Sequence, residues 1–314
     1  MSVRAFVFPG QGSQAVGMGR DLAAAFAPAR ELFEEVDEAL KQKLSALMFE
    51  GPAETLTLTA NAQPALMAMS LAVVRVLERE GGVSLPRVAR LVAGHSLGEY
   101  SALAAAGAFD VAAAARLLRL RGEAMQQAVP AGAGAMAALL GLELDQAAAI
   151  CAEAAQGEVV EVANDNGGGQ VVISGAAAAV ERAIALAKAR GVKRALPLPV
   201  SAPFHCALMA PAADAMARAL AAEPPRPPLV PVVANVTAEP VSDPVEIRDL
   251  LVRQVTATVR WRESVAAMKA EGVDTVVELG AGKVLAGLVR RIAPEMAASS
   301  VGSPAEIEAF LKTV

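Results

Sequence analysis

The sequence predicts an α/β protein in which a mainly parallel sheet carries a second, smaller domain as an insertion. Two observations predict this architecture. Short apolar runs alternate with helix-forming segments in the first and last thirds of the chain, whereas the middle shows the order strand, helix, strand, strand, helix, strand. A glycine-rich break at Pro130–Gly134 starts this middle region. We therefore expect a discontinuous large domain of residues 1–130 and 200–314 and a small domain of residues 131–199.

The first third of the chain predicts the start of the large domain. Its expected elements are strands at 5–8 and 91–93 and helices at 21–44, 64–80, 97–106 and 110–129. Pro64 suits the first turn of a helix, because the N–H that proline lacks has no partner there in any case. Asp110 suits an N-cap, and Gly107 is expected to end the preceding helix.

The middle of the chain predicts a self-contained unit. Its expected elements are strands at 136–142, 159–163, 171–174 and 192–198 and helices at 145–155 and 176–190. This βαββαβ order is the ferredoxin-like split motif. The run Asn164–Gln170 is most simply its hairpin turn, since asparagine and glycine tolerate positive φ.

The last third returns to the large domain. The expected elements are helices ending near 222 and at 245–255, 262–271 and 283–292, with strands at 230–234 and 275–279. We expect them to complete the parallel sheet.

Composition favours a mildly acidic enzyme. The chain of 314 residues is 54% hydrophobic, but much of this share is alanine and no uninterrupted apolar stretch has the ~20 residues that span a membrane. A net charge of −5 argues against nonspecific nucleic-acid binding. Cys151 and Cys206 form no C-x-x-C pair, and the N-terminus suits a first strand rather than a signal peptide. We expect free thiols, no membrane attachment and a cytoplasmic location.

The segment Gly94–Gly98 predicts a nucleophile elbow. In the pattern G-x-S-x-G the glycines permit a sharp turn from strand to helix, and Ser96 projects from its apex. Leu97 then presents its backbone N–H at a helix N-terminus, where developing negative charge is stabilised. An ordinary glycine-serine turn is the alternative that the bare pattern leaves open.

An activated serine needs a base, and the chain offers two histidines. His95 adjoins Ser96 on the tight turn, so their side chains should diverge, and His205 is favoured by geometry. A filler role for His205 in its loop is the alternative. No Asp or Glu between Ser96 and His205 stands in a recognisable acid-bearing motif, so another group is expected to orient the histidine.

Arg121 lies on the apolar stripe of its helix, so a charge is expected to face inward. Such a charge needs a partner, which is either a buried carboxylate or an anionic ligand. From the sequence alone we favour the buried carboxylate, because buried charges usually have protein partners.

The loop Gly10–Gln14 follows the first strand, where α/β folds bind ligands, and its backbone can supply a second oxyanion N–H. A plain strand-end turn is the alternative. The two histidines and two cysteines give no metal-ligand spacing, so no metal is expected.

Several motifs in one order resemble malonyl-CoA:acyl carrier protein transacylases. They are Phe8–Gln14, Gly94–Glu99, Arg121–Gly122 with Met125–Gln126, Gly134–Ala138, Asn164–Gln170, Pro203–His205 and Glu278–Leu285. The resemblance spans about residues 5 to 292. It implies a hydrolase-like α/β domain with a ferredoxin-like insertion, and an acyltransferase of fatty acid synthesis that needs no cofactor. Malonyl-CoA and acyl carrier protein are the implied partners, and we expect a monomer.

The resemblance also implies catalytic roles. Ser96 would take the malonyl group from the CoA thioester, with His205 as base and later acid. The backbone N–H groups of Gln11 and Leu97 would form the oxyanion hole. The backbone carbonyl of Gln254 would orient His205, which explains the missing acid.

Binding roles follow in the same way. Arg121 would pair with the free malonyl carboxylate, Asn164 and Asn166 would lie near the pantetheine arm, and His95 would be a substrate or supporting contact. Phe204 stands where the bacterial stand-alone enzymes often have serine. It resembles the malonyl-selective domains of polyketide synthases, and its bulk should disfavour a 2-methyl substituent.

The expected reaction is ping-pong acyl transfer through malonyl-Ser96. Basic residues of the small domain, which are Lys188, Arg190, Lys193 and Arg194, are candidates for docking the acidic carrier, and a solvated helix end is the alternative. A transacylase of malonate decarboxylase or of a polyketide pathway is the nearest rival function. A serine hydrolase is disfavoured by Arg121 and the absent acid, and a noncatalytic carrier-binding module is disfavoured by Ser96 with His205.

Overall fold

Two sheets organise the protein, of which the computed structural model describes residues 2–314. The strands are β1 (Arg4–Phe8), β2 (Leu91–Gly94), β3 (Gly134–Leu140), β4 (Val160–Asp165), β5 (Gln170–Ala176), β6 (Arg194–Pro197), β7 (Val232–Val233), β8 (Pro240–Val241), β9 (Thr275–Leu279) and β10 (Ala297–Val301). The helices of the first half are α1 (Arg20–Ala25), α2 (Ala27–Leu40), α3 (Leu44–Glu50), α4 (Ala53–Thr57), α5 (Thr59–Arg79), α6 (Leu85–Val88), α7 (Leu97–Ala105), α8 (Val111–Gln127) and α9 (Leu144–Ala155). The helices of the second half are α10 (Ala177–Ala189), α11 (Ala210–Ala222), α12 (Pro244–Gln254), α13 (Trp261–Ala270), α14 (Val284–Ile292) and α15 (Pro304–Leu311), with a 3-10 turn at Ala207–Met209.

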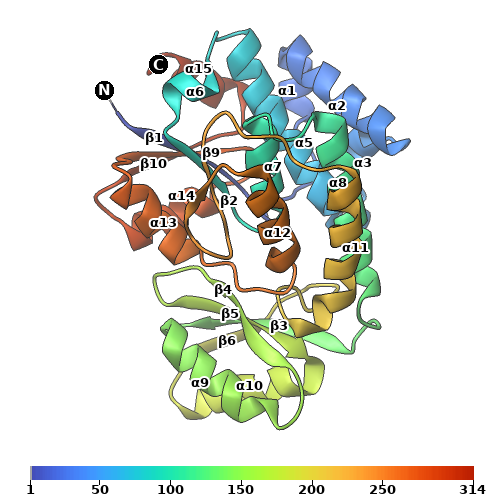
Figure 1. Cartoon of the computed structure of the whole chain (residues 1–314), viewed down its shortest axis with the longest axis vertical. Helices are drawn as coiled ribbons and strands as arrows, with labels where there is room; N and C mark the ends of the chain where they lie inside the picture. The colour runs from blue at the N-terminus through green and yellow to red at the C-terminus, as the bar shows by residue number, and fades with distance from the viewer. Residues whose placement is uncertain (1) are drawn as a thin grey trace.

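The larger sheet has the strand order β10-β9-β1-β2-β7-β8 and is parallel except for its last pair. Figure 1 shows this sheet among helices in the upper part of the molecule, near both chain termini. The predicted mainly parallel α/β fold is therefore confirmed. Parallel strands end at one edge, so the loops after β1 and β2 meet there, as they must to build a shared site.

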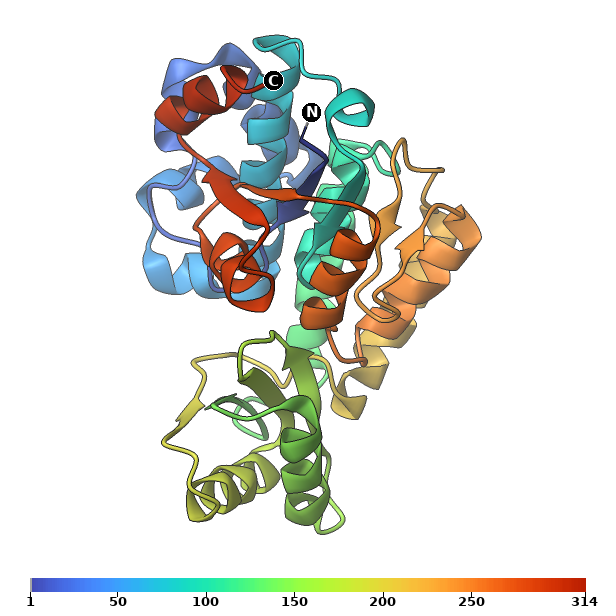
Figure 2. The same ribbon diagram turned by 90° about the vertical axis from the view of Figure 1, so that its left-hand side faces the viewer.

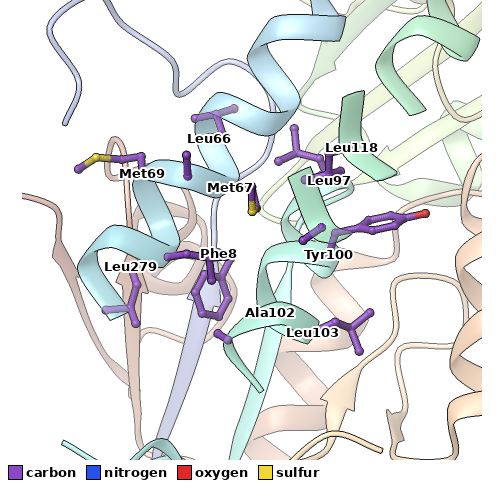
Figure 3. Packing of buried hydrophobic residues seen from close by; sticks show 14 of the residues in the cluster. Phe8, Leu66, Met67, Met69, Leu97, Tyr100, Ala102, Leu103, Leu118 and Leu279 are labelled. Carbon is purple, nitrogen blue, oxygen red and sulfur yellow. The ribbon is translucent and has the colours of Figure 1, made fainter. Parts of the chain in front are cut away.

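Helices cover both faces of this sheet because its central strands are apolar on both sides. On β1, Phe6 and Phe8 belong to the cluster that includes α5 and α7, whereas Ala5 and Val7 face the cluster of α13 and α14. Figure 3 shows Phe8 of β1 among side chains of α5 and α7, and Leu97, the first residue of α7, beside Leu118 of α8. The first turn of α7 is thus anchored in the core directly after Ser96.

The core helix α5 is long and apolar enough to cross a membrane by length and composition, but 89% of its most apolar window is buried inside the protein. It packs against α2, α7 and α8. Its apolar character is accounted for by burial on nearly all sides, as in the core helix of a large domain.

The smaller sheet has the order β4-β5-β3-β6 and is antiparallel throughout. Its elements follow in the order β3, α9, β4, β5, α10, β6, and both helices pack on it around a separate apolar cluster. Figure 2 shows this unit as a distinct body below the larger sheet. Main-chain hydrogen bonds join the two bodies where the N–H of Asp165 donates to the carbonyl of Val259 (3.0 Å) and the N–H of Val259 donates to that of Ala163 (2.9 Å).

Three expectations about elements are wrong. The helix expected at 21–44 is divided into α1, α2 and α3. α1 ends before α2 because Pro28 has no N–H to continue a helix and its ring would clash with a carbonyl of α1. α2 ends before α3 at Lys41, whose φ of 51° is left-handed. The helix expected to open at Pro64 starts five residues earlier, at Thr59. Its polar first turns are helical because Asn61 and Gln63 find partners, in the carbonyl of Thr55 (2.9 Å) and the hydroxyl of Thr59 (3.0 Å).

The large domain was also expected to finish with the helix at 283–292, but β10 and α15 follow it. β10 is an edge strand in which only Val301 is fully buried, so its sequence carries little apolar periodicity.

Candidate active site

A cavity of about 390 Å³ lies between the carboxyl edge of the larger sheet and the small body. The sequence-predicted site residues that line it are Gln11, His95, Ser96, Leu97, Arg121, Asn164, Phe204 and His205. Residues from the loops after β1 and β2, from α8, from the small body and from the segment that follows it therefore share one site. Asn166 and Gln254 are not in its lining, but each hydrogen-bonds residues that are.

The turn at Ser96 is sharp and depends on two glycines. Ser96 has φ 55° and ψ −112°, a conformation that a non-glycine residue adopts only at a cost of order 1–3 kcal/mol. A Cβ on Gly94 would lie 1.9 Å from the backbone of Gly98, and a Cβ on Gly98 would lie 2.2 Å from the carbonyl oxygen of Phe8. Only glycine fits at either position, so the elbow pattern reflects steric necessity.

Ser96 and His205 are hydrogen-bonded, with 2.7 Å between Oγ and Nε2. The other ring nitrogen, Nδ1, lies 2.9 Å from the carbonyl oxygen of Gln254 and 3.1 Å from that of Ala257. Carbonyls only accept, so Nδ1 carries the proton and Nε2 accepts from the serine hydroxyl. No carboxylate within residues 2–314 pairs with the His205 ring; two main-chain carbonyls orient it.

Burial lowers the pKa of His205 to about 3, and the nearby positive charge of Arg121 acts in the same direction. The imidazole is therefore neutral at pH 7 and ready to accept a proton. The His205 side chain can hold that proton once negative charge develops on the reacting group beside it.

Gln11 and Leu97, whose backbone amides are the candidates for an oxyanion hole, both line the cavity with Ser96. Leu97 is the first residue of α7, so its N–H has no acceptor inside the helix. The N–H of Ser96 itself is occupied, because it donates to Oδ1 of Asn235 (2.7 Å). Gln11 lines the cavity, and its side-chain oxygen accepts from the hydroxyl of Thr59 (2.9 Å), which fixes the loop after β1.

Arg121 is 1% exposed and hydrogen-bonds three cavity-side oxygens. Nη1 donates to Oε1 of Gln63 (2.8 Å), and Nη2 donates to Oε1 of Gln254 (2.8 Å) and to Oγ of Ser96 (3.1 Å). Its Cζ lies 5.7 Å from the ring centre of Tyr100, within cation–π range. The guanidinium thus stands directly beside the serine hydroxyl.

The favoured sequence interpretation of Arg121, a structural ion pair, is wrong. No Asp or Glu in the described chain has an oxygen within 4.0 Å of the guanidinium, and its Nε is buried without a hydrogen-bond partner. The contacts of the guanidinium are the neutral amides of Gln63 and Gln254, the Ser96 hydroxyl and the Tyr100 ring, so its charge can pair with an anion that enters the cavity.

The small body contributes the opposite wall. Nε2 of His95 lies 2.9 Å from Oδ1 of Asn166, so the elbow and the β4–β5 turn are in direct contact. Burial lowers the pKa of His95, which keeps this ring neutral. Gly167, Gly168 and Gly169 all have positive φ, as a hairpin turn requires, while Asn164 before them faces the cavity.

Sequence reasoning missed three polar residues that hold the site together, which are Gln63, Glu99 and Asn235. Glu99 directly follows the elbow pattern and Gln63 precedes a proline, but Asn235 had no local signal. Each makes its key contact with a residue far along the chain. Such partners become visible only when the fold is known.

The basic residues proposed for docking lie on the outer surface of the small body, and all four are exposed. Arg190 pairs with Glu153, so part of its charge is already neutralised. Lys188, Lys193 and Arg194 form no salt bridge with any described residue.

Comparison with known proteins identifies this arrangement. The profile of the acyl transferase domain matches residues 5–303. The chain is 51% identical over 312 residues to the malonyl CoA-acyl carrier protein transacylase of Escherichia coli K12, covering 99% of this chain and 100% of that protein.

Solved structures agree. An acyl-carrier-protein-S-malonyltransferase from Bartonella henselae superposes with a TM-score of 0.97 at 56% identity, covering 99% of both chains. A type II PKS malonyl-transacylase, solved in complex with its acyl-carrier protein, superposes with a TM-score of 0.96 at 46% identity over 100% of both chains.

Proposed function

The chain belongs to the malonyl CoA-acyl carrier protein transacylases of the acyl transferase family, and we propose that it moves a malonyl group from malonyl-CoA to the phosphopantetheine thiol of an acyl carrier protein, supplying fatty acid synthesis. The observation that carries this assignment is the guanidinium of Arg121, which is buried 3.1 Å from the Ser96 hydroxyl and has no carboxylate partner among residues 2–314. A nucleophilic serine beside a guanidinium that lacks an anionic partner suits an acyl group with a free carboxylate, because the guanidinium can bind that carboxylate.

In the first half-reaction, Oγ of Ser96 attacks the thioester carbonyl of malonyl-CoA while Nε2 of His205 takes the hydroxyl proton. The backbone N–H groups of Gln11 and Leu97 stabilise the oxyanion of the tetrahedral intermediate. The C–S bond then breaks and His205 returns the proton to the CoA thiolate. The products are malonyl-Ser96 and free CoA.

The second half-reaction reverses these roles with a new thiol. The phosphopantetheine thiol gives its proton to His205 and attacks the ester carbonyl, and Ser96 regains the proton as it leaves. Throughout, Arg121 holds the malonyl carboxylate and so fixes the carbonyl against Ser96. Both half-reactions use groups of the protein, the thioester of malonyl-CoA and the thiol of the carrier, and the proposed mechanism needs no cofactor.

The small body supplies the wall along which the thiol arm reaches Ser96. Its strand order and element order support a ferredoxin-like insertion of residues 131–199 in a hydrolase-like domain of residues 1–130 and 200–314. Asn164, which lines the cavity, and Asn166, which contacts the cavity residue His95, are the candidates to lie near the pantetheine arm. Phe204 lines the cavity and narrows the space beside the malonyl methylene. We expect a monomer in the cytoplasm.

Labelling distinguishes this function from its rivals. The protein is incubated with isotopically labelled malonyl-CoA, the adduct is located by peptide mass spectrometry, and either holo acyl carrier protein or buffer is then added. Transfer to the carrier with slow loss to buffer supports the proposal. Rapid loss to buffer would indicate a hydrolase, and no adduct on Ser96 would indicate a noncatalytic module.

A further inference from the structure

Gln254 contacts Arg121, Ser96 and His205, the three residues to which the proposed reaction assigns side-chain roles. Its side chain contacts the first two and its backbone contacts the third. Its Oε1 accepts from Nη2 of Arg121 (2.8 Å), and its Nε2 donates to the carbonyl oxygen of Ser96 (3.0 Å). Its own carbonyl accepts from Nδ1 of His205. The amide must therefore point one way only, with oxygen towards the guanidinium, because a reversed amide would place N–H donors against N–H donors.

The group that best fixes this direction is the carboxylate of Glu99. Glu99 is 2% exposed, and its Oε2 accepts from Nε2 of Gln254 (2.8 Å) and from the backbone N–H of Asn235 (3.0 Å). The other acceptors of Nε2 are more distant, with the Ser96 carbonyl at 3.0 Å and Oδ1 of Asn235 at 3.3 Å. Because Oε2 already accepts two N–H groups, a proton on this carboxyl group would sit on Oε1, and Oε2 acts as an acceptor in either protonation state.

Glu99 has no cationic partner in hydrogen-bond reach. No Lys, Arg or His nitrogen of the described chain lies within 4.0 Å of its carboxylate, and Arg121 is reached only through the Gln254 amide. Burying a carboxyl group without such a partner is costly, so its presence here calls for a positional explanation. Burial raises its pKa to about 7, and hydrogen bonds from Asn235 and Gln254 act against that rise.

We propose that Glu99 is a positioning residue, which holds the Gln254 amide so that its oxygen anchors Arg121 beside Ser96. The inference rests on the proposed malonyl transfer, since Arg121 matters only for an acyl group with a carboxylate. Through this chain of contacts, Glu99 maintains selectivity for the carboxylated acyl group without touching the substrate.

The test compares kcat/KM for malonyl-CoA and acetyl-CoA in the full-length chain. Glu99→Leu removes the acceptor at similar size, and we expect the malonyl-to-acetyl ratio to fall about tenfold, the effect of one misplaced hydrogen bond. Glu99→Gln is the matched control, because its amide oxygen can accept both hydrogen bonds. Its ratio should stay within about threefold of wild type. A general loss of packing would lower both rates and leave the ratio unchanged.

Gln254→Met supplies an independent variant if Glu99→Leu fails to fold. Methionine keeps the side-chain length and the backbone carbonyl that orients His205 but has no side-chain amide. The malonyl-to-acetyl ratio should therefore again fall about tenfold or more. A wild-type ratio in Gln254→Met or in folded Glu99→Leu, or an equal loss in Glu99→Gln and Glu99→Leu, would overturn the inference. A wild-type protein without any malonyl preference would instead overturn the proposed function and the inference with it.

Discussion

Arg121→Ala is the perturbation whose outcome follows most directly from the structure. The guanidinium has no carboxylate partner in residues 2–314, so the malonyl carboxylate would be its first anionic contact. Hydrogen bonds to charged groups are worth about 1.5–3 kcal/mol each, and a guanidinium pairs with a carboxylate through two of them. Loss of both should lower kcat/KM for malonyl-CoA by about 3–6 kcal/mol of transition-state stabilisation, or roughly 10² to 10⁴-fold.

Acetyl-CoA has no carboxylate to lose, so acetyl transfer should be spared or rise in the same variant. The assay follows CoA release from each thioester with saturating holo acyl carrier protein. Arg121→Lys keeps the charge but not the two-pronged geometry, and its malonyl rate should lie between the wild type and Arg121→Ala. Equal losses for malonyl and acetyl transfer in Arg121→Ala would refute the assigned role.

Three further predictions concern selectivity, pH and the carrier. Phe204→Ser should raise kcat/KM for methylmalonyl-CoA relative to malonyl-CoA by roughly 10- to 100-fold, because it enlarges the cavity by more than a methyl group. Equal kcat/KM values for the two thioesters in the wild type would contradict the steric role of Phe204. Burial lowers the pKa of His205 in the folded protein to about 3 from its ordinary value of 6.5, so the unfolded chain takes up a proton first as pH falls. Its contribution to the free energy of unfolding should decline by about 1.4 kcal/mol per pH unit between pH 6.5 and pH 3. Chemical denaturation of wild type and His205→Gln measures this decline, and parallel pH curves for the two proteins would contradict it. Reversing the charges of Lys188, Lys193 and Arg194 should lower kcat/KM for the carrier at low salt but not for malonyl-CoA, whereas an unchanged carrier value would show that docking lies elsewhere.

The sequence was informative where the cause is local. Gly94, Ser96 and Gly98 are contiguous, and the clash that excludes any other residue at the two glycines arises within the turn and the adjacent strand β1. Helix α8 was also predictable, because Asp110 caps it by accepting from the N–H of Ala113 (2.7 Å) and an apolar stripe marks its inner face.

The sequence did not predict which distant residues the site residues contact. The stripe on α8 showed that Arg121 is buried, but not that the amides of Gln63 and Gln254 would receive it instead of a carboxylate. These residues come from α5 and α12, and no sequence pattern in either helix indicates that both contact Arg121. The same reason hid Asn235, which reaches the backbone N–H of Ser96 from 139 residues away.

Competition between two thioesters on one serine tests the central claim most directly. The protein is mixed with equal concentrations of malonyl-CoA and acetyl-CoA, quenched before any carrier is added, and analysed by intact mass and by peptide mapping of the adduct. A malonyl adduct on Ser96, in large excess over acetyl and absent from Ser96→Ala, is the predicted result. An acetyl adduct in equal or greater amount, or a malonyl adduct on another residue, would contradict the claim that Arg121 selects the group that Ser96 carries.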